Sequence, residues 1–199
     1  MSVKIIFVRH GQSTGNVTGG FYDEPKCRLT KLGEFQAELT GLELGRMIDD
    51  GVGAVYCSTY ERAIQTCTLA MMASGIEYPR IVFDDRIRER GFAGLVGRPI
   101  GEDGDTRENA VSPEDYQKIW TYGHPIQAEL KIETVGSVIE RMWRFLNDIA
   151  RKHQNKTVIV FSHGGVGRVM HAMCKEWPEG GCLYNIPFLF NAEVTTFQI

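Results

Sequence analysis

Val3–Val8 reads VKIIFV and Thr157–Phe161 reads TVIVF, and these two runs decide the fold. Each has the length and β-branched character of a strand, and each leads directly into a histidine-glycine pair, in Arg9-His10-Gly11 and Ser162-His163-Gly164. Continuous apolar runs are typical of strands buried on both faces of a parallel sheet. We therefore expect both histidines at the carboxyl edge of one sheet, which is where ligands bind in open α/β folds.

The bulk composition is that of an ordinary globular chain. Its 199 residues are 43% hydrophobic and 24% charged, with a net charge of -3. This length fits one domain, and the acidic balance argues against a nucleic-acid partner or a membrane surface, which call for a basic face. There is no signal-peptide pattern and no apolar stretch of bilayer length, so we expect a cytoplasmic protein. The 5 cysteines lack metal-knuckle spacing and fit free thiols in a reducing compartment.

Strand and helix signals alternate along the chain. Further strands are expected at Val52–Cys57, Ile81–Phe83 and Glu193–Phe197. Helices are expected after Thr30, after a capping box formed by Ser58 and Glu61, from Ser137, and from Gly165 to Cys174. Helices that fill the crossovers are typical of parallel sheets. The sequence thus predicts an α/β fold: a three-layer α/β/α sandwich with a mostly parallel central sheet.

Two of these helices carry apolar residues at helical spacing. They are Leu32, Phe35, Leu39 and Leu42 in the first, and Val138, Met142, Phe145 and Ile149 in the helix from Ser137. Such stripes are typical of a helix face that packs on a core. We expect the second stripe, together with Trp143, to lie in the core.

Residues 98–131 break the alternation of strands and helices. They are rich in proline and glycine and hold one brief helix, begun by Ser112-Pro113-Glu114. We expect a single domain over residues 1–199, in which residues 98–131 form an insertion, or lid, over the sheet edge. His124 lies in this insertion, either as a substrate contact or as a loop histidine without a role.

The residues beside the two histidines favour a phosphate site. Arg9 precedes His10, and Arg62 lies in the first turn of a helix that follows a strand. Guanidinium groups meet phosphate oxygens in pairs and keep their charge, and a helix N-terminus offers free N–H groups to an anion. Ser13 and Asn16, in the glycine-rich loop after His10, are further candidate donors.

Two histidines and a carboxyl group indicate covalent chemistry. A histidine nucleophile attacks phosphorus as neutral imidazole, and neighbouring guanidinium groups favour that form. One histidine would attack while the other stabilises the transferring oxygens. Glu89 is the candidate donor of a proton to the leaving group. We add Arg90, beside Glu89, and Gly164, beside His163, to the candidate substrate-binding residues.

At this point the chain resembles the histidine phosphatase superfamily, branch one, the phosphoglycerate mutase-like proteins. The matching blocks, in order, are Arg9-His10-Gly11 with Asn16; Leu29-Thr30 with Gly33, Gln36 and Ala37; Ser58 with Arg62, Ala63, Gln65 and Thr66; Ile87 with Glu89, Phe92 and Gly97; and Ser162-His163-Gly164-Gly165. The resemblance covers nearly the whole chain except the insertion. It implies a phosphohistidine on His10, a pocket of Arg9, Arg62 and His163, proton donation by Glu89, a small phosphorylated substrate, and no metal or other cofactor.

Departures from the family's patterns bear on the substrate. Glu89-Arg90 with Leu95 and Gly97 is similar to the acid block of phosphoglycerate mutases. Gly165, however, stands where those mutases usually carry asparagine, and the Gly164-Gly165 pair is similar to the phosphatases. Val96 stands where many phosphatases have glutamate. These points favour hydrolysis of phosphomonoesters, with a mutase-type phosphotransferase as the alternative.

Other interpretations remain beside this one. The histidines are candidates for a transition-metal site completed by Cys27 or Glu89, although clustered arginines would repel a cation. Glu89 is also a candidate surface ion-pair partner of Arg88 or Arg90. From a different class of protein, a non-catalytic scaffold module would keep the phosphate pocket without turnover. The sequence leaves the natural substrate and the oligomeric state open.

Overall fold

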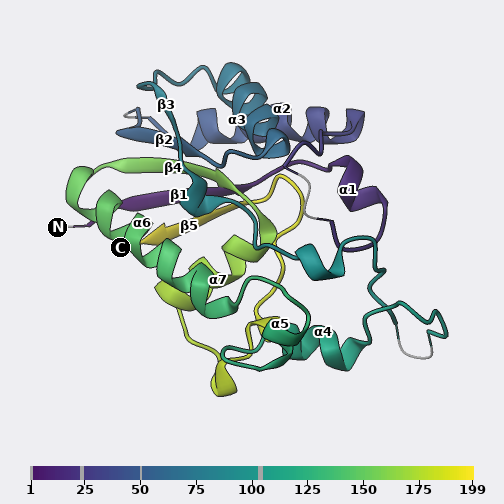
Figure 1. Ribbon diagram of the computed structural model, residues 1–199. Helices are drawn as coiled ribbons and strands as arrows, with labels where there is room; N and C mark the ends of the chain where they lie inside the picture. Colours follow the sequence, from purple (N-terminus) through teal and green to yellow (C-terminus); the bar gives the residue numbers. More distant parts are fainter. Residues whose placement is uncertain (1, 23–24, 50, 103–104) are drawn as a thin grey trace.

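The computed structural model describes residues 2–22, 25–49, 51–102 and 105–199. Its centre is a five-stranded sheet in the order β3-β2-β4-β1-β5 (Figure 1). The strands are β1 (Lys4–Arg9), β2 (Ala54–Cys57), β3 (Ile81–Phe83), β4 (Thr157–Ser162) and β5 (Val194–Gln198). The pairs β1–β4, β2–β4 and β2–β3 are parallel, and β5 runs antiparallel to β1. The mostly parallel sheet is confirmed.

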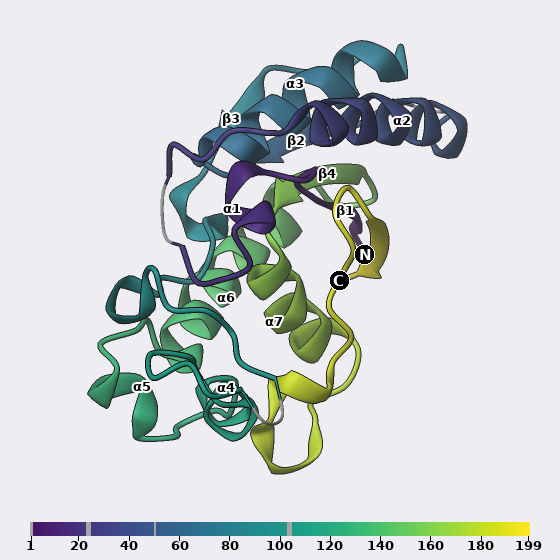
Figure 2. The same ribbon diagram turned by 90° about the vertical axis from the view of Figure 1, so that its right-hand side faces the viewer.

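Helices cover both faces of the sheet (Figures 1 and 2). On one side lie α2 (Lys31–Met47) and α3 (Glu61–Ser74), and on the other α6 (Val135–Lys152) and α7 (Gly164–Cys174). Alternate residues of each central strand point to opposite faces, so the sheet contributes side chains to two apolar cores, one on each face. Ile6 and Val8 pack with α2 and α3, whereas Ile5 and Phe7 pack with α6 and α7. This three-layer arrangement is the predicted α/β/α sandwich.

The short elements lie mainly in the loops at the carboxyl edge. They are α1 (Thr14–Val17), η1 (Asp85–Ile87), η2 (Ala93–Leu95), α4 (Pro113–Ile119), α5 (Ile126–Glu129), η3 (Glu179–Gly181) and η4 (Leu183–Asn185). No helix in the described ranges has the length and apolar character needed to cross a bilayer.

The register of β1 and β4 sets the position of the two histidines. Arg9 pairs with Ser162, so that His10 and His163 both follow directly at the same edge. The main-chain N–H of His10 donates to the carbonyl of Ser162 at 3.0 Å, which extends the ladder by one step. The apolar strands thus bring together two residues that are far apart in the sequence.

The apolar stripe predicted for α2 does not face the core. Leu32, Phe35, Leu39 and Leu42 are all exposed, Phe35 to 56%. The opposite, small-residue face is buried, and a Cβ on Gly41 would overlap the main chain of Ala70 in α3. Close backbone packing of α2 against α3 therefore overrides the spacing of the large apolar residues.

The α6 stripe is confirmed except for one residue. Val138, Met142, Phe145 and Ile149 are fully buried, whereas Trp143 is 61% exposed. Trp143 follows Met142 by one position, which turns its side chain about 100° around the helix, away from the core face.

The capping box predicted from Ser58 is wrong. Helix α3 begins at Glu61 with Tyr60 as its N-cap, and no side chain caps it. The prediction for α2 was right, since Thr30 Oγ1 accepts from the N–H of Gly33 at 3.1 Å. Ser58 lies two positions too early to cap α3, and its hydroxyl is used in the site described below.

Residues 98–131 contain the predicted brief helix and a second one. Ser112 caps α4, accepting from the N–H of Asp115 at 3.1 Å, and α5 lies beside α4 (Figures 1 and 2). Ile119 and Trp120 are buried in the core on the α6 and α7 side. The segment is therefore packed against the sheet layers through its own apolar residues.

Candidate active site

His10 and His163 face one another at the carboxyl edge of the sheet. Their ring centroids are 5.2 Å apart and the ring planes are inclined by 60°. Both side chains are buried, at 2% and 0% exposure. The two imidazoles that the sequence places 153 positions apart are therefore neighbours, as required for joint action on one group.

Hydrogen bonding assigns the tautomer of His10. Its Nδ1 lies 2.7 Å from the carbonyl oxygen of Gly11, which only accepts, so Nδ1 carries the proton. Its Nε2 then holds the lone pair and accepts from Arg62 Nε at 3.2 Å. Burial, with added repulsion from Arg62 and Arg9, holds the pKa of His10 well below its ordinary value. These contacts are those of a neutral ring whose lone pair lies on Nε2.

His163 is held by a hydroxyl group from the neighbouring strand end. Its Nε2 lies 2.7 Å from Ser58 Oγ, and its Nδ1 is buried without a hydrogen-bond partner in the described part of the chain. Burial, Arg62 and His10 lower its pKa well below the ordinary value. Sequence reasoning assigned Ser58 a capping role and therefore missed its contact with His163.

The two predicted arginines approach the histidines from different elements. Arg62, in the first turn of α3, is 1% exposed and lies between the rings of Tyr22 and Tyr60, at 5.4 and 5.1 Å. Arg9 ends β1, and its Nη1 donates to the carbonyl of Leu189. Burial lowers the pKa of Arg9, and its Nε is buried with no partner among the described residues. A buried donor of this kind is suited to an anion.

Glu89 presents its carboxyl group to the same space. Its Oε1 accepts from the N–H of Arg90 at 2.8 Å, and its Oε2 accepts from the N–H of Gly165 at 3.3 Å. Arg88 instead pairs with Glu133, and Arg90 donates to main-chain carbonyls at Glu133 and Ile119. The interpretation of Glu89 as a surface ion-pair partner therefore does not match the structure.

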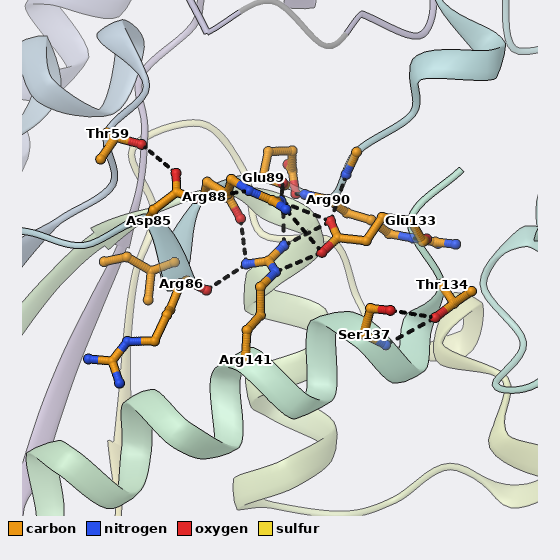
Figure 3. Close-up of polar contacts among 12 residues, drawn as sticks. Thr59, Asp85, Arg86, Arg88, Glu89, Arg90, Glu133, Thr134, Ser137 and Arg141 are labelled. Carbon is orange, nitrogen blue, oxygen red and sulfur yellow. Dashed lines mark hydrogen bonds and ion pairs between the residues drawn. The ribbon is translucent and has the colours of Figure 1, made fainter. Parts of the chain in front are cut away.

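A network behind Glu89 fixes its backbone (Figure 3). Arg141 of α6 donates to the carbonyls of Arg86 and Arg88, at 2.6 and 2.8 Å, and to that of Glu89 at 3.3 Å. Its Nε also donates to Glu133 Oε1 at 2.9 Å. Burial alone would raise the pKa of Glu133, but Arg141 and Arg88 hold it below the ordinary value. The ion pair of Arg141 and Glu133 thus anchors the segment after η1 that carries Glu89.

The glycine-rich loop after His10 is ordered by Asn16. Its Oδ1 accepts from the N–H and Oγ of Ser13, at 2.9 and 3.0 Å, and from Asn191 Nδ2 at 3.1 Å. Ser13 Oγ also lies 3.3 Å from the hydroxyl of Tyr22. Asn16 faces the cavity described next, and Ser13 is buried behind it.

These residues surround one cavity of about 490 Å³. Its lining includes Arg9, His10, Asn16, Arg62 and Glu89. Of the other predicted site residues, Ser13, Arg90, His163 and Gly164 do not form part of that lining. His163 is the direct neighbour of His10, whereas Arg90 is fully buried among main-chain carbonyls. His124 is also elsewhere, with its Nδ1 accepting from the N–H of Ile126 at 3.2 Å.

Several residues of the cavity were not predicted. They include Arg168 of α7 and the aromatic residues Phe21, Tyr22, Phe92, Tyr116, Trp120, Tyr184 and Phe188. Arg168 had a readable signal, because it follows Gly165 by three positions and so shares its helix face. The aromatic residues come from segments without a regular period, and the sequence offered no comparable signal for them.

Comparisons with known proteins identify the class that this fold and site define. The family model of the histidine phosphatase superfamily (branch 1) matches residues 5–199, so the chain belongs to that family. The chain is 28% identical over 182 residues to a metal-independent phosphoserine phosphatase of Arabidopsis thaliana, covering 92% of this chain and 73% of that one. It is also 28% identical over 186 residues to a 2,3-bisphosphoglycerate-dependent phosphoglycerate mutase of Corynebacterium diphtheriae, covering 84% and 75%.

Solved structures agree with the fold. The chain is similar to Bacillus stearothermophilus YhfR, with a TM-score of 0.78, 25% identity, and coverage of 98% of this chain and 90% of that one. A mycobacterial glucosyl-3-phosphoglycerate phosphatase gives a TM-score of 0.78 at 19% identity, covering 97% and 91%. The relatives therefore include phosphatases and phosphoglycerate mutases, which act on phosphorylated small molecules.

Proposed function

We propose that this chain is a phosphatase that hydrolyses phosphomonoesters through a phosphohistidine on His10. The observation that carries the proposal is the Nε2 lone pair of His10, which lines the cavity beside Arg62 and has the ring of His163 5.2 Å away. A neutral nucleophile inside a ring of cationic and hydrogen-bonding groups is suited to attack on a phosphate ester.

In the first step, the hydrogen bond from Arg62 Nε to His10 Nε2 is released, the freed lone pair of Nε2 attacks phosphorus, and the P–O bond to the leaving group breaks. Arg9 and Arg62 offset the charge on the equatorial oxygens, since guanidinium groups bind phosphate in pairs of hydrogen bonds. His163 contributes a further donor at its Nδ1, which has no hydrogen-bond partner among the residues that the structure describes. The leaving alkoxide takes its proton from Glu89, which ends the step as a carboxylate.

In the second step, water attacks the phosphohistidine. Glu89, now the base, accepts a proton from the water, the P–N bond breaks, and the electron pair returns to His10 Nε2. Inorganic phosphate then leaves and the starting tautomer is restored. The cycle consumes one water and uses only side chains of this chain, without a metal.

Gly165 favours hydrolysis over the mutase alternative. The mutases that the sequence resembles usually carry asparagine there, and a Cβ on Gly165 would lie 2.5 Å from Glu89 Oε1 and 3.0 Å from Trp120. An asparagine therefore requires Glu89 or Trp120 to move. Residues 98–131 supply Ile100, Tyr116 and Trp120 to the cavity wall, which supports their proposed role as a lid within one domain.

The test is turnover of p-nitrophenyl phosphate by the parent and by His10→Ala. We expect release of phosphate by the parent only, without stimulation by a bisphosphorylated primer. Strong stimulation by 2,3-bisphosphoglycerate, with transfer to phosphoglycerate faster than to water, would instead support the mutase. Tight vanadate binding without any turnover would support the scaffold module.

A further inference from the structure

Arg168 is a third arginine of the cavity, and the steps above do not use it. It lies on α7, lines the cavity and is only 7% exposed. Its Nε and Nη1 are buried and have no hydrogen-bond partner within the described ranges of the chain. Buried polar groups are normally satisfied, and a buried charge without an acceptor is costly.

Aromatic rings surround this guanidinium group in place of carboxylates. Its Cζ lies 4.6 Å from the ring centroid of Phe188, 4.9 Å from that of Trp120 and 5.7 Å from that of Tyr184. Cation–π contacts stabilise the charge in part, but an aromatic ring stacked on the guanidinium group does not accept a hydrogen bond from its in-plane N–H groups. Burial lowers the pKa of Arg168, as expected for a cation with incomplete compensation. The guanidinium group of Arg168 therefore has two buried donors, Nε and Nη1, that are available to an acceptor in the cavity.

The charge balance of the cavity leaves room for one more negative charge. Its charged lining groups are Arg9, Arg62, Glu89 and Arg168. When Glu89 is protonated for its role as acid, three positive charges face a phosphoryl dianion, and one positive charge remains unmatched. A single carboxylate matches that charge, whereas a second phosphate dianion would exceed it.

We propose that Arg168 binds a carboxylate on the organic part of the same substrate. The substrate is then a phosphomonoester of a small organic acid, whose carboxylate meets Arg168 while its phosphoryl group meets His10. This inference rests on the proposed phosphatase activity and specifies its substrate class. A cavity of about 490 Å³ accommodates such a molecule, and the rings of Trp120 and Phe188 would contact its organic body.

The test compares matched esters that differ in one charge. Parent enzyme and Arg168→Met are assayed with 3- and 4-carboxyphenyl phosphate and with the corresponding carboxamides, which have nearly the same shape. We expect the parent to prefer the carboxylate in kcat/KM, and Arg168→Met to lower that preference by about 10- to 100-fold, the range of one charge-assisted hydrogen-bonded contact. Arg168→Lys keeps the positive charge and should retain part of the preference for the carboxylate ester.

Arg46→Met is the matched control, because it removes one positive charge from an exposed position of α2. It should leave the carboxylate preference unchanged. The same preference in the parent and in Arg168→Met would overturn the proposed subsite while leaving the phosphatase activity in place. A larger Arg168-dependent gain with 1,4-phenylene bisphosphate would assign the second anion to a phosphate and overturn the carboxylate.

Binding provides a readout that does not need turnover. The non-hydrolysable 4-carboxybenzylphosphonate and its carboxamide are titrated calorimetrically into the same variants. We expect the affinity ratio to fall in Arg168→Met as it does in catalysis. Failure of hydrolysis by the parent, together with an Arg168-dependent affinity ratio, would reject the phosphatase function but keep the carboxylate site. An affinity ratio independent of Arg168 would reject the site.

Discussion

Arg62 Nε donates to His10 Nε2 across 3.2 Å, so the nitrogen with the lone pair already has a cationic donor beside it. A phosphoryl group that bonds to this nitrogen would arrive next to the guanidinium. The contact therefore orients the proposed nucleophile in the free protein and lies where the proposed mechanism has to offset charge on phosphate oxygens. Arg62 reaches this place because α3 starts directly after β2, at the same edge as His10.

Replacement of Arg62 by lysine should lower kcat/KM for p-nitrophenyl phosphate. Lysine keeps the charge but loses the planar pair of donors, so we expect a decrease of about 10²- to 10³-fold, as for the loss of one preorganised donor. Steady-state kinetics measure it, and the unfolding midpoint checks that the fold is intact. Activity within about threefold of the parent would show that the contact to His10 is structural only.

Gly165→Ala should separate activity from stability. The added Cβ would lie 2.5 Å from Glu89 Oε1, the end of a flexible side chain, so Glu89 yields while the backbone stays in place. We expect a decrease in kcat of about tenfold or more, the scale of a lost general acid, with little change in the unfolding midpoint. Gly136→Ala is the control, because its Cβ would meet its nearest neighbour at an ordinary 3.5 Å. Equal kcat values for the two variants would contradict the packing of Glu89 against α7.

Glu133→Gln should destabilise the protein more than Glu140→Gln, a matched substitution that breaks an exposed ion pair on α6. Glu133 accepts from Arg88, Arg141 and Gly91, and its loss leaves Arg141 partly buried without its carboxylate. We expect a loss of about 3 kcal/mol in the free energy of unfolding. Glu140→Gln breaks an exposed pair with Arg144 and should cost less than about 1 kcal/mol. Urea unfolding of both variants checks the difference, and similar losses would contradict the anchoring role.

Stability should fall in acid because two histidines are buried in the neutral form. The folded pKa values of His10 and His163 lie below the unfolded value of about 6.5, so the unfolded chain binds more protons as the pH decreases. Their contribution is complete above that pH and is lost as the pH falls from about 6.5 toward the folded pKa values. Urea unfolding at pH 8 and pH 5.5 measures this, and His10→Gln should reduce the difference. An unchanged difference would show that the pKa of His10 is not lowered in the folded state.

Activity should survive removal of divalent metals. The proposed steps use two histidines, two arginines and a carboxyl group, and none of them requires a cation. We expect the same kcat with p-nitrophenyl phosphate before and after dialysis against EDTA. Loss of turnover that Mg²⁺ or Zn²⁺ restores would favour the metal interpretation of the two histidines.

The sequence predicted those parts of the site that depend on strand order. Because Ile5–Val8 and Val158–Phe161 are uninterrupted apolar runs, both segments were expected to be buried strands, and neighbouring parallel strands bring His10 and His163 to one edge. Arg62 was found in the same way, from its place just after a strand, whereas Glu89 was chosen as a carboxyl group beside arginines and from the resemblance to the family's acid block. Local pattern and tertiary structure agree at these positions.

At other positions, tertiary packing determined features that the local sequence pattern does not encode. The apolar stripe of Leu32, Phe35, Leu39 and Leu42 was a wrong guide, because small residues on the other face of α2 allow a closer approach to α3. Ser58 has the sequence form of an N-cap, yet its hydroxyl lies at His163. These contacts depend on distances between segments, which local periodicity does not encode.

The most direct test of the covalent mechanism is rapid acid-quench trapping with ³²P-labelled substrate, followed by peptide mapping. We predict a phosphoprotein in the parent that is labile in acid and stable in base, with the label on the peptide that contains His10, and none in His10→Ala. Undiminished label or full turnover in His10→Ala would contradict the phosphohistidine mechanism.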